Sequence, residues 1–264
     1  MNNASVLHNQ VQEFLSVSDG QFSEINQAVL RGTVPFISRL RQVGGAQRFT
    51  GGTIIADTVS VALLALFPRR VKISPEEAMW WQKYYSDNYG IVADLSELQV
   101  PAPTDYPTRL IVMHEAISGK CNPVAAVYKK HCEAKGFGWL QFNNDLDSVV
   151  TYHDRSGTYA IRVRDTQEAE FGNVNGENLS SQQIWDRGIT TTTLPERLID
   201  GGTYLLKTGK QLDTKVITLC AGSRATGGFI PGVGFLPNDS EVYINDWGPS
   251  DAGDDLRFRL AMLT

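Results

Sequence analysis

Cysteines, histidines and long hydrophobic runs are scarce in this chain of 264 residues. Its three cysteines, Cys121, Cys132 and Cys220, match no zinc-binding spacing, so we expect free thiols with at most one adventitious pair. The longest apolar run, Val61–Phe67, is far shorter than the roughly 20 residues that span a bilayer. The first residues lack the basic and apolar regions of a signal peptide. We therefore predict no membrane insertion, and the location stays open between the virion surface and the cytoplasm.

Basic residues are in the minority. The chain has 24 lysines and arginines against 29 aspartates and glutamates, a net charge of −5 at pH 7. This balance disfavours a broad phosphate-binding surface, so we expect no nucleic-acid partner. Hydrophobic residues make up 42% and charged residues 20%, as in ordinary globular domains, and the chain is long enough to bury a substantial core.

Signatures of cofactor binding and catalysis are also missing. Gly232-Val-Gly234 lacks the strand-to-helix context of a dinucleotide site, and the chain has no phosphate-loop lysine motif. His131 and Cys132 are adjacent, and adjacent residues on a helix do not face each other, so no thiolate–imidazole pair is expected. The other histidines, His8, His114 and His153, are scattered along the chain. We predict no cofactor and no catalytic residue.

Two groups of side chains are weak candidates for metal binding. His153 and Asp154 have no spacing that fixes them near Glu115, which favours a surface histidine beside a turn. The aspartates of the C-terminal loop offer hard oxygen ligands for Ca²⁺, yet they lack the usual Asp-x-Asp-x-Asp-Gly pattern. These residues are Asp251, Asp254 and Asp255. A solvated acidic loop is favoured, and no metal ligand is predicted.

Residues 1–100 are predicted to form a helix-rich, mixed N-terminal part. Its clearest helix spans residues 75–89, because Ser74 and Glu77 match a capping box and Gly90 follows the end. Five aromatic residues crowd this helix: Trp80, Trp81, Tyr84, Tyr85 and Tyr89. A packing face made by Trp81, Tyr84 and Tyr85 is favoured over an aromatic platform for a ligand. Prolines between residues 100 and 108 then indicate a stiff entry into a second domain, residues 101–264.

The second domain is predicted to combine short strands with two helices. Expected strands span residues 109–113, 139–142, 148–152, 158–164, 216–219, 241–244 and 256–260. Apolar and polar residues alternate at 158–164, as on a half-exposed strand. One helix is expected at 180–187, and the other begins at the capping box of Thr193 and Glu196. In that helix Gly201 and Gly202 are expected to allow close approach to a sheet. This order predicts an α+β fold.

The last 45 residues, 220–264, alternate short strand patterns with loops of Gly, Ser, Asn, Asp and isolated aromatics. Recognition surfaces are often built as rigid strands that carry such loops, although a plain Gly-rich β terminus is an open alternative. The predicted frame, mostly core, is Val216, Ile217, Leu219, Val242, Ile244, Leu256, Phe258 and Leu260. The side chains predicted to face a ligand are Ser223, Arg224, Thr226, Phe229, Phe235, Asn238, Asp239, Tyr243, Asn245, Trp247, Ser250, Asp251 and Asp254.

Two blocks of this region resemble a known family. Cys220-Ala-Gly-Ser-Arg224 resembles the Arg-Gly-Gly-Ser-Trp segment of C-type lectin folds of the formylglycine-generating-enzyme type. Residues 247–260, which end in Leu-Arg-Phe-Arg-Leu, resemble their closing segment and its Gly-Phe-Arg-Leu. Both blocks are similar to those of bacterial and viral variable proteins that diversity-generating retroelements diversify. The resemblance covers roughly residues 158–263 and does not reach residues 1–100.

The resemblance implies a C-type-lectin-like C-terminal domain that displays a variable surface to a protein or glycan ligand. Arg257 replaces the family's Gly, and the catalytic cysteine pair and the calcium signature Trp-Asn-Asp are missing, so neither oxidase chemistry nor calcium-dependent sugar binding is implied. Two other classes stay open. One is a small hydrolase or oxidase on the same scaffold, and the other is a virion structural component that forms an oligomer through its N-terminal part.

Overall fold

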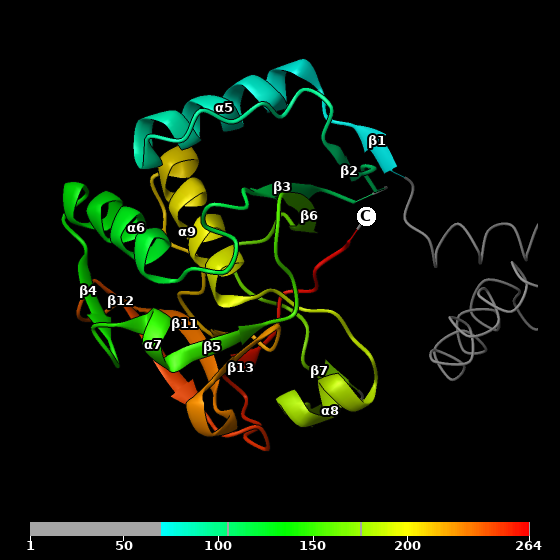
Figure 1. The fold of residues 1–264 in the computed structure, drawn as a ribbon. Helices are drawn as coiled ribbons and strands as arrows, with labels where there is room; N and C mark the ends of the chain where they lie inside the picture. The colour runs from blue at the N-terminus through cyan, green and yellow to red at the C-terminus, as the bar shows by residue number, and fades with distance from the viewer. Residues whose placement is uncertain (1–69, 105, 175, 264) are drawn as a thin grey trace, which may run out of the picture. The chain divides into compact units, whose positions relative to one another are not determined.

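The computed structural model describes residues 70–104, 106–174 and 176–263 (Figure 1). The described residues belong to one compact unit, Arg69–Thr264. Residues 70–100, assigned above to the N-terminal part, lie in the same unit as the C-terminal domain, whereas the features expected in residues 1–69 lie outside the described residues. This unit mixes helices with parallel and antiparallel strands, which confirms the α+β class.

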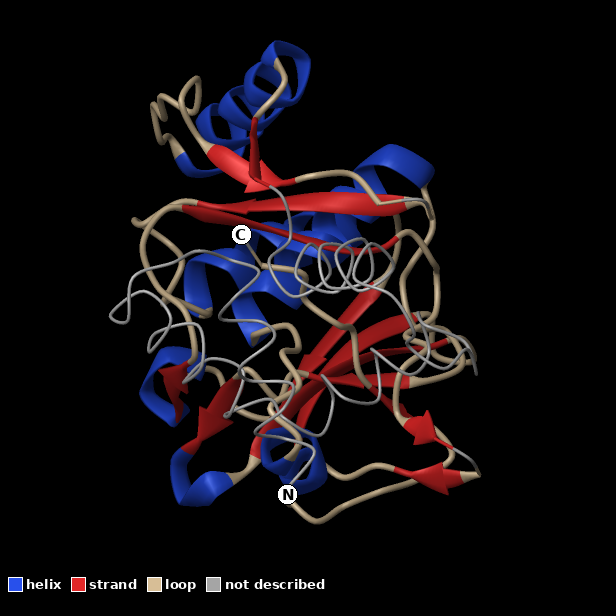
Figure 2. Cartoon of the chain, turned by 90° about the vertical axis from the view of Figure 1, so that its right-hand side faces the viewer, coloured by secondary structure: helices blue, strands red, loops and turns tan. Residues whose placement is uncertain are grey.

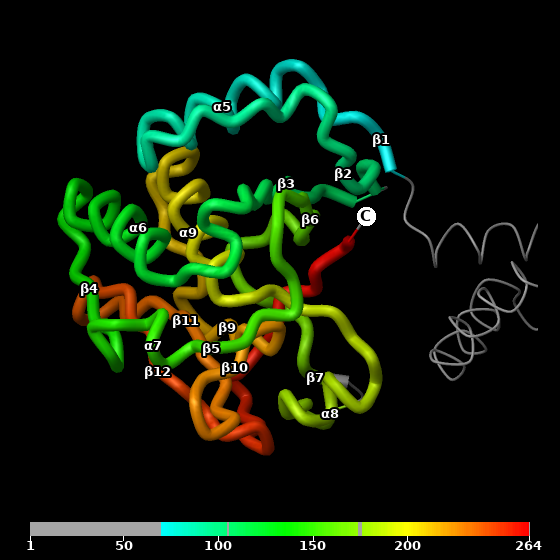
Figure 3. The backbone as a smooth tube through the Cα atoms, viewed as in Figure 1, coloured from blue at the N-terminus to red at the C-terminus, as the bar shows by residue number. Residues whose placement is uncertain are grey.

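The largest sheet among the described residues has five strands in the order β13-β9-β11-β12-β4. These strands are β4 Gly138–Gln141, β9 Ile217–Leu219, β11 Ile230–Leu236, β12 Glu241–Trp247 and β13 Leu256–Arg257. β11 and β12 form an antiparallel hairpin, β9 pairs antiparallel with β11, and β4 and β13 lie parallel to their neighbours at the two edges. The backbone trace shows how strands far apart in the chain meet in this sheet (Figure 3).

The other described strands form separate pairs. β3 Thr108–Met113 pairs with β6 Tyr159–Arg164, and Met262 bridges Arg162, so the C-terminal residues run beside this pair (Figure 2). The remaining pairs are β1 Arg70–Lys72 with β2 Gln99–Pro101, β5 Val150–His153 with β10 Ser223–Ala225, and β7 Asn173–Val174 with β8 Glu177–Asn178. The β5–β10 pair brings residues 150–153 beside the segment that follows Cys220.

The long described helices are α5 Pro75–Tyr89, α6 Asn122–Ala134 and α9 Leu194–Thr208, and the short ones are α7 Leu146–Val149, α8 Ser181–Asp186 and the 3-10 turn Thr226–Gly228. The predicted caps of α5 and α9 are confirmed, because Ser74 and Thr193 accept hydrogen bonds from the third backbone N–H of each helix. Gly90 and Gly209 end these helices with φ of 65° and 72°.

Helix α9 lies at the centre of the unit, with α6 beside it (Figure 1). Trp81, Tyr84 and Tyr85 of α5 are buried, which confirms their packing role. Gly201 approaches helix α6 instead of a sheet: a Cβ atom there would lie 2.6 Å from the ring of Tyr128. The earlier expectation of a sheet contact was wrong because helix α6, which was not predicted from the sequence, packs on this side of α9.

Two apolar clusters hold the unit together. The larger includes α5, α6, α9 and the inward face of the five-stranded sheet, where Val233, Val242 and Ile244 are buried. The smaller lies around β9, the start of β11 and β13, where α8 adds Ile184, and Leu219 and Phe258 are fully buried. All three cysteines are buried and free, as expected.

Two expectations about exposure are corrected. In β6, Ala160, Ile161, Arg162 and Val163 are all buried, so this strand is not half exposed. Arg162 is tolerated there because its Nε donates to the carbonyl of Pro101 at 2.7 Å. Leu260 was predicted to belong to the core frame, but it is 39% exposed. At this point the chain has left the five-stranded sheet and forms a single β-bridge with Thr191.

Charged residues form a buried network beside α9. Asp213 accepts from Arg197 at 2.8 Å and from Arg259 at 2.6 Å. Asp200 accepts from two nitrogens of Arg109, each at 2.9 Å. This network joins α9, the loop after it, β3 and the C-terminal segment that follows β13, because each acid is held by an arginine from another segment.

Candidate functional site

Strand β12 has one face that packs in the core and one face that points away from it. Val242 and Ile244 are about 1% exposed and belong to the larger cluster. Tyr243 and Asn245 alternate with them and point to the opposite face of the sheet, where Leu140 of β4 pairs with Tyr243 and is 53% exposed. The predicted division between core and surface therefore holds along this strand.

Glycines in β11 let aromatic rings lie close to the sheet. A Cβ at Gly232 would lie 2.5 Å from the ring of Trp247, and one at Gly234 would lie 2.7 Å from the ring of Tyr243. The two rings are 6.4 Å apart between centroids, at an interplanar angle of 56°. Each aromatic side chain covers a glycine on the neighbouring strand, which fixes its orientation without another large side chain.

Trp247 also supports the fold. It packs against the smaller apolar cluster, next to Ile217, and pairs in register with Ile230. Its side chain is only partly exposed, in contrast to Asn245 two residues earlier. We therefore interpret Trp247 as a brace at the border of the surface and Tyr243 as the better placed contact residue.

Arg224 is held between two aromatic rings. Its guanidinium carbon lies 4.6 Å from the ring centre of Tyr152 and 4.2 Å from that of Trp185. A carboxylate oxygen of Asp154 lies 3.7 Å from a guanidinium nitrogen of Arg224. The indole nitrogen of Trp185 donates to the carbonyl of Ala221 at 2.8 Å and so fixes one wall of the stack. An arginine stacked in this way loses little side-chain entropy when it binds an acceptor.

The Arg224 stack and the surface of β12 are linked through neighbouring elements. Trp185 and Trp247 pack against the same smaller cluster. Gln182 of α8 donates its backbone N–H to the carbonyl of Pro249 at 2.8 Å. Thr226 and Phe229, both exposed, lie between Arg224 and the start of β11. We call the set Tyr152, Trp185, Arg224, Thr226, Phe229, Tyr243, Asn245 and Trp247 the aromatic–arginine face.

Several predicted residues lie elsewhere. Asn238 and Asp239 are exposed in the turn between β11 and β12, at the opposite end of the hairpin from Trp247. Phe235, near that turn, packs edge to face on Phe137 at 5.5 Å. The thirteen predicted residues thus do not form one continuous face, because a hairpin places the two ends of its strands far apart.

Ser223 is fully buried, contrary to the expectation that it faces a ligand. Its hydroxyl accepts from the backbone N–H of Leu194 at 2.9 Å and lies 2.7 Å from Nδ1 of His153. Cys121 lies 3.9 Å from Nε2 of the same histidine. Burial is the main cause that raises the pKa of Cys121, and the neighbouring Asp147 and Cys220 raise it further. Burial lowers the pKa of His153. Both shifts favour neutral groups, which suits a buried structural cluster better than a thiolate nucleophile.

The acidic C-terminal loop uses its carboxylates locally. Asp251 accepts from the backbone N–H of Gly248 at 2.8 Å, and Asp254 accepts from the amide of Asn178 at 2.6 Å. Ser250 is exposed beside them. Among residues 70–263, apart from positions 105 and 175, the structure contains no group of three or more His, Cys, Asp or Glu side chains that could hold a metal ion.

Comparison of the chain with protein-family models, curated proteins and solved structures gives no significant match. In the part of the chain that the structure describes, the helices are too short or too polar to cross a membrane.

Sequence reasoning missed Tyr152 and Trp185. Tyr152 falls in a predicted strand and Trp185 in a predicted helix, and Arg224 was predicted to face a ligand, but the contact of both rings with Arg224 was not foreseen. The contact depends on the pairing of β5 with β10, across about 70 residues of chain, which no local pattern indicates.

Proposed function

We propose that this chain is a ligand-binding protein, with a C-type-lectin-like domain that binds a protein or glycan through the aromatic–arginine face. The observation that carries the proposal is the Arg224 side chain stacked between Tyr152 and Trp185 on the surface. Arginine and large aromatic residues are the types that dominate binding energy at interfaces. Here they are held in place before any ligand binds, which lowers the entropic cost of association.

The segregation of β12 supports the same function. Its inward side chains complete the core, whereas Tyr243 and Asn245 can change without loss of that core. Such independence between frame and surface is what a diversified binding protein requires. It agrees with the resemblance of the C-terminal blocks to variable proteins of diversity-generating retroelements.

Binding by matched variants tests the proposal. The wild-type chain is screened against arrays of glycans and of cell-surface protein domains, and each ligand found is measured again with Arg224→Ala and Tyr243→Ala. We expect each substitution to cost about 2 kcal/mol, a roughly thirtyfold loss of affinity. Arg164→Ala is the matched control, because Arg164 also stacks on a tyrosine, Tyr106, at 4.9 Å, but outside this face. Equal affinities of the Arg224→Ala and Arg164→Ala variants would refute the assignment.

Diversification is tested separately in the genome. We expect a neighbouring reverse-transcriptase gene and a near-copy of the segment that encodes residues 220–260, with differences confined to adenines. A locus without such a copy would remove the retroelement from the proposal and leave the binding face to be judged by the affinity measurements.

A further inference from the structure

The five-stranded sheet has one edge that the described part of the chain leaves uncovered. Strand β4 is the last strand on that side, and among the described strands it pairs with β12 alone (Figure 1). At the other edge, just beyond β13, Phe258 exchanges backbone hydrogen bonds with Phe171 at 2.6 and 3.3 Å, so the chain itself continues the pairing there. Edge strands are usually protected by a charge, a proline or a bulge. Gly138-Trp-Leu-Gln141 contains neither charge nor proline, and its register with β12 is unbroken.

The free side of β4 carries backbone groups that can pair with another strand. Gly138 donates its N–H to the carbonyl of Ser240 at 2.8 Å, and Phe142 donates to β12 in the same way at 3.0 Å. Because the direction of these groups alternates along a strand, the N–H and C=O of Trp139 and Gln141 point away from the sheet. Outside the ladder with β12, the described residues give these groups no hydrogen-bond partner. An added strand would supply the missing partners.

A groove of about 560 Å³ lies beside this edge. One wall is β4, and the other wall is one face of helix α6, because its lining residues are three or four positions apart. These residues are Asn122, Ala125, Ala126 and Lys129. The two alanines are small and leave room above the strand for the side chain of another chain. Since neighbouring strands lie about 4.8 Å apart, the groove between the edge and the helix suits a single extended chain.

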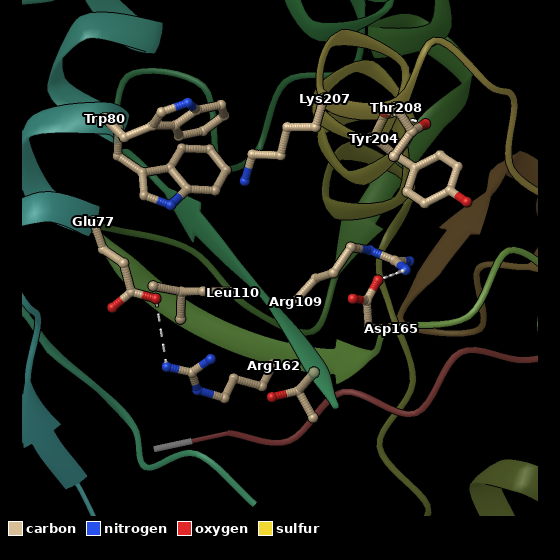
Figure 4. Close-up of a pocket in the computed structure, with 11 residues that line it drawn as sticks. Glu77, Trp80, Arg109, Leu110, Arg162, Asp165, Tyr204, Lys207 and Thr208 are labelled. Atoms are coloured by element: carbon tan, nitrogen blue, oxygen red, sulfur yellow. Dashed lines mark hydrogen bonds and ion pairs between the residues drawn. The ribbon is translucent and has the colours of Figure 1, made fainter. Parts of the chain in front are cut away.

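The cavity between α5, the β3–β6 pair and α9 lacks unpaired groups of this kind. Its arginines are already held by carboxylates: Arg109 donates to Asp165 at 2.9 Å, and Arg162 lies 3.7 Å from Glu77. Figure 4 shows the two guanidinium groups turned to opposite sides of that cavity, each toward its carboxylate. The groove beside β4 is therefore the better candidate for a further binding site.

We propose that the edge of β4 binds an extended peptide segment of a partner protein, which joins the five-stranded sheet as an additional strand. The peptide backbone pairs with Trp139 and Gln141, and such main-chain pairing supplies most of the affinity when a strand is added to a sheet. Alternate side chains of the peptide point toward α6, where Ala125 and Ala126 accept a small apolar group. The others lie beside Leu140, which is 53% exposed on the opposite face of the sheet.

A second copy of this chain suits the edge less well than a peptide. Pairing of β4 with the β4 of another copy about a two-fold axis would bring a second α6 to the same seam, where the first α6 already lines the groove. A peptide segment brings no such helix. The proposal does not depend on the aromatic–arginine face, which is formed by other residues.

Selection of heptapeptides from a random display library on the full chain tests the inference. We expect the enriched peptides, prepared synthetically, to bind Ala126→Glu about tenfold more weakly than wild type, because the new side chain occupies the groove. Ala134→Glu is the matched control and should bind like wild type, since Ala134 is also an exposed alanine of α6 but does not line the groove. Arg224→Ala should also bind normally, and a loss in that variant would place the peptides on the aromatic–arginine face.

Methylation of the peptide backbone tests the strand pairing itself. N-methyl groups on alternate residues remove either the N–H groups that face β4 or those that face away from it. We expect one pattern to abolish binding and the other to change the affinity by less than about threefold. Amide hydrogen exchange at Trp139 and Gln141 should slow when the unmodified peptide binds, whereas exchange at Leu140, whose N–H faces β12, should not change.

Three results would overturn the inference: no peptide is enriched, Ala126→Glu and Ala134→Glu bind the enriched peptides equally, or both methylation patterns have the same effect. Analytical ultracentrifugation of the full chain tests a second copy as the occupant. A dimer that Ala126→Glu dissociates and Ala134→Glu does not would assign the edge to a second copy, and this result would also overturn the inference.

Discussion

At the scale of single residues, the three aromatic side chains Tyr243, Trp247 and Phe258 differ in what surrounds them. Phe258 is fully buried, Trp247 packs partly on the smaller cluster, and Tyr243 lies over Gly234 beside the Trp247 ring, outside both apolar clusters. Substitution by Ala should therefore lower the free energy of unfolding by about 3–5 kcal/mol at Phe258, about 1–3 at Trp247 and less than about 1 at Tyr243. Urea denaturation of the three variants measures this order, and a larger loss at Tyr243 than at Trp247 would contradict it.

The same residues show what sequence alone predicts. Alternation along β12 correctly separated Val242 and Ile244 from Tyr243 and Asn245, because side-chain direction in a strand has a period of two. The burial of Ser223 was not predictable, since it depends on His153 and Leu194, which contact it only in the folded chain.

At the scale of elements, helix α9 contains two adjacent glycines at which substitution by Ala should change stability in opposite directions. A Cβ at Gly201 would lie 2.6 Å from the Tyr128 ring, which is fixed by a hydrogen bond from its hydroxyl to Gln211 at 2.7 Å. A Cβ at Gly202 would come no closer than 3.6 Å to another residue. Gly201→Ala should therefore destabilise by about 1–3 kcal/mol, and Gly202→Ala should stabilise by about 0.4–1 kcal/mol. Thermal unfolding of both variants checks the prediction, which fails if the two melting temperatures move together.

Helix ends were predictable where their signals are local, and elements were missed where they are not. The caps of α5 and α9 lie within four residues of the helices they start. The start of α6 is instead held by Asp147, which accepts from the backbone of Cys121 and Asn122. β11 contains Pro231, Gly232 and Gly234, which favour a loop unless a partner strand and its aromatic side chains are already known.

At the scale of the whole molecule, the buried network makes stability depend on arginines that hold two acids. Arg259 lies between Asp213, at 2.6 Å, and Asp200, at 4.0 Å, and so joins the C-terminal segment after β13 to α9. Arg259→Met should lower the free energy of unfolding by about 3–5 kcal/mol, because it removes one of the two arginines that pair with buried Asp213 and one donor from each of two backbone carbonyls. Arg164→Met, at an exposed ion pair with Glu170, is the control and should cost less than about 1 kcal/mol. Chemical denaturation measures both variants, and an equal loss of unfolding free energy in Arg259→Met and Arg164→Met would contradict a stabilising role for the buried network.

The network also sets how stability responds to acid. Burial by itself would raise the pKa of Asp200, but Arg109, Arg259 and Arg197 outweigh it and hold that pKa below its usual value. A carboxyl with a lowered folded-state pKa contributes stability above its unfolded pKa of about 4, and this contribution is lost as pH falls toward the folded value. Asp200→Asn should therefore be less stable at neutral pH and lose less stability than wild type below about pH 4. Urea titrations across this pH range test the difference, and Asp87→Asn, at an exposed ion pair, is the control. Parallel pH profiles of the stability of wild type and Asp200→Asn would show that the pKa of Asp200 does not differ between the folded and unfolded states.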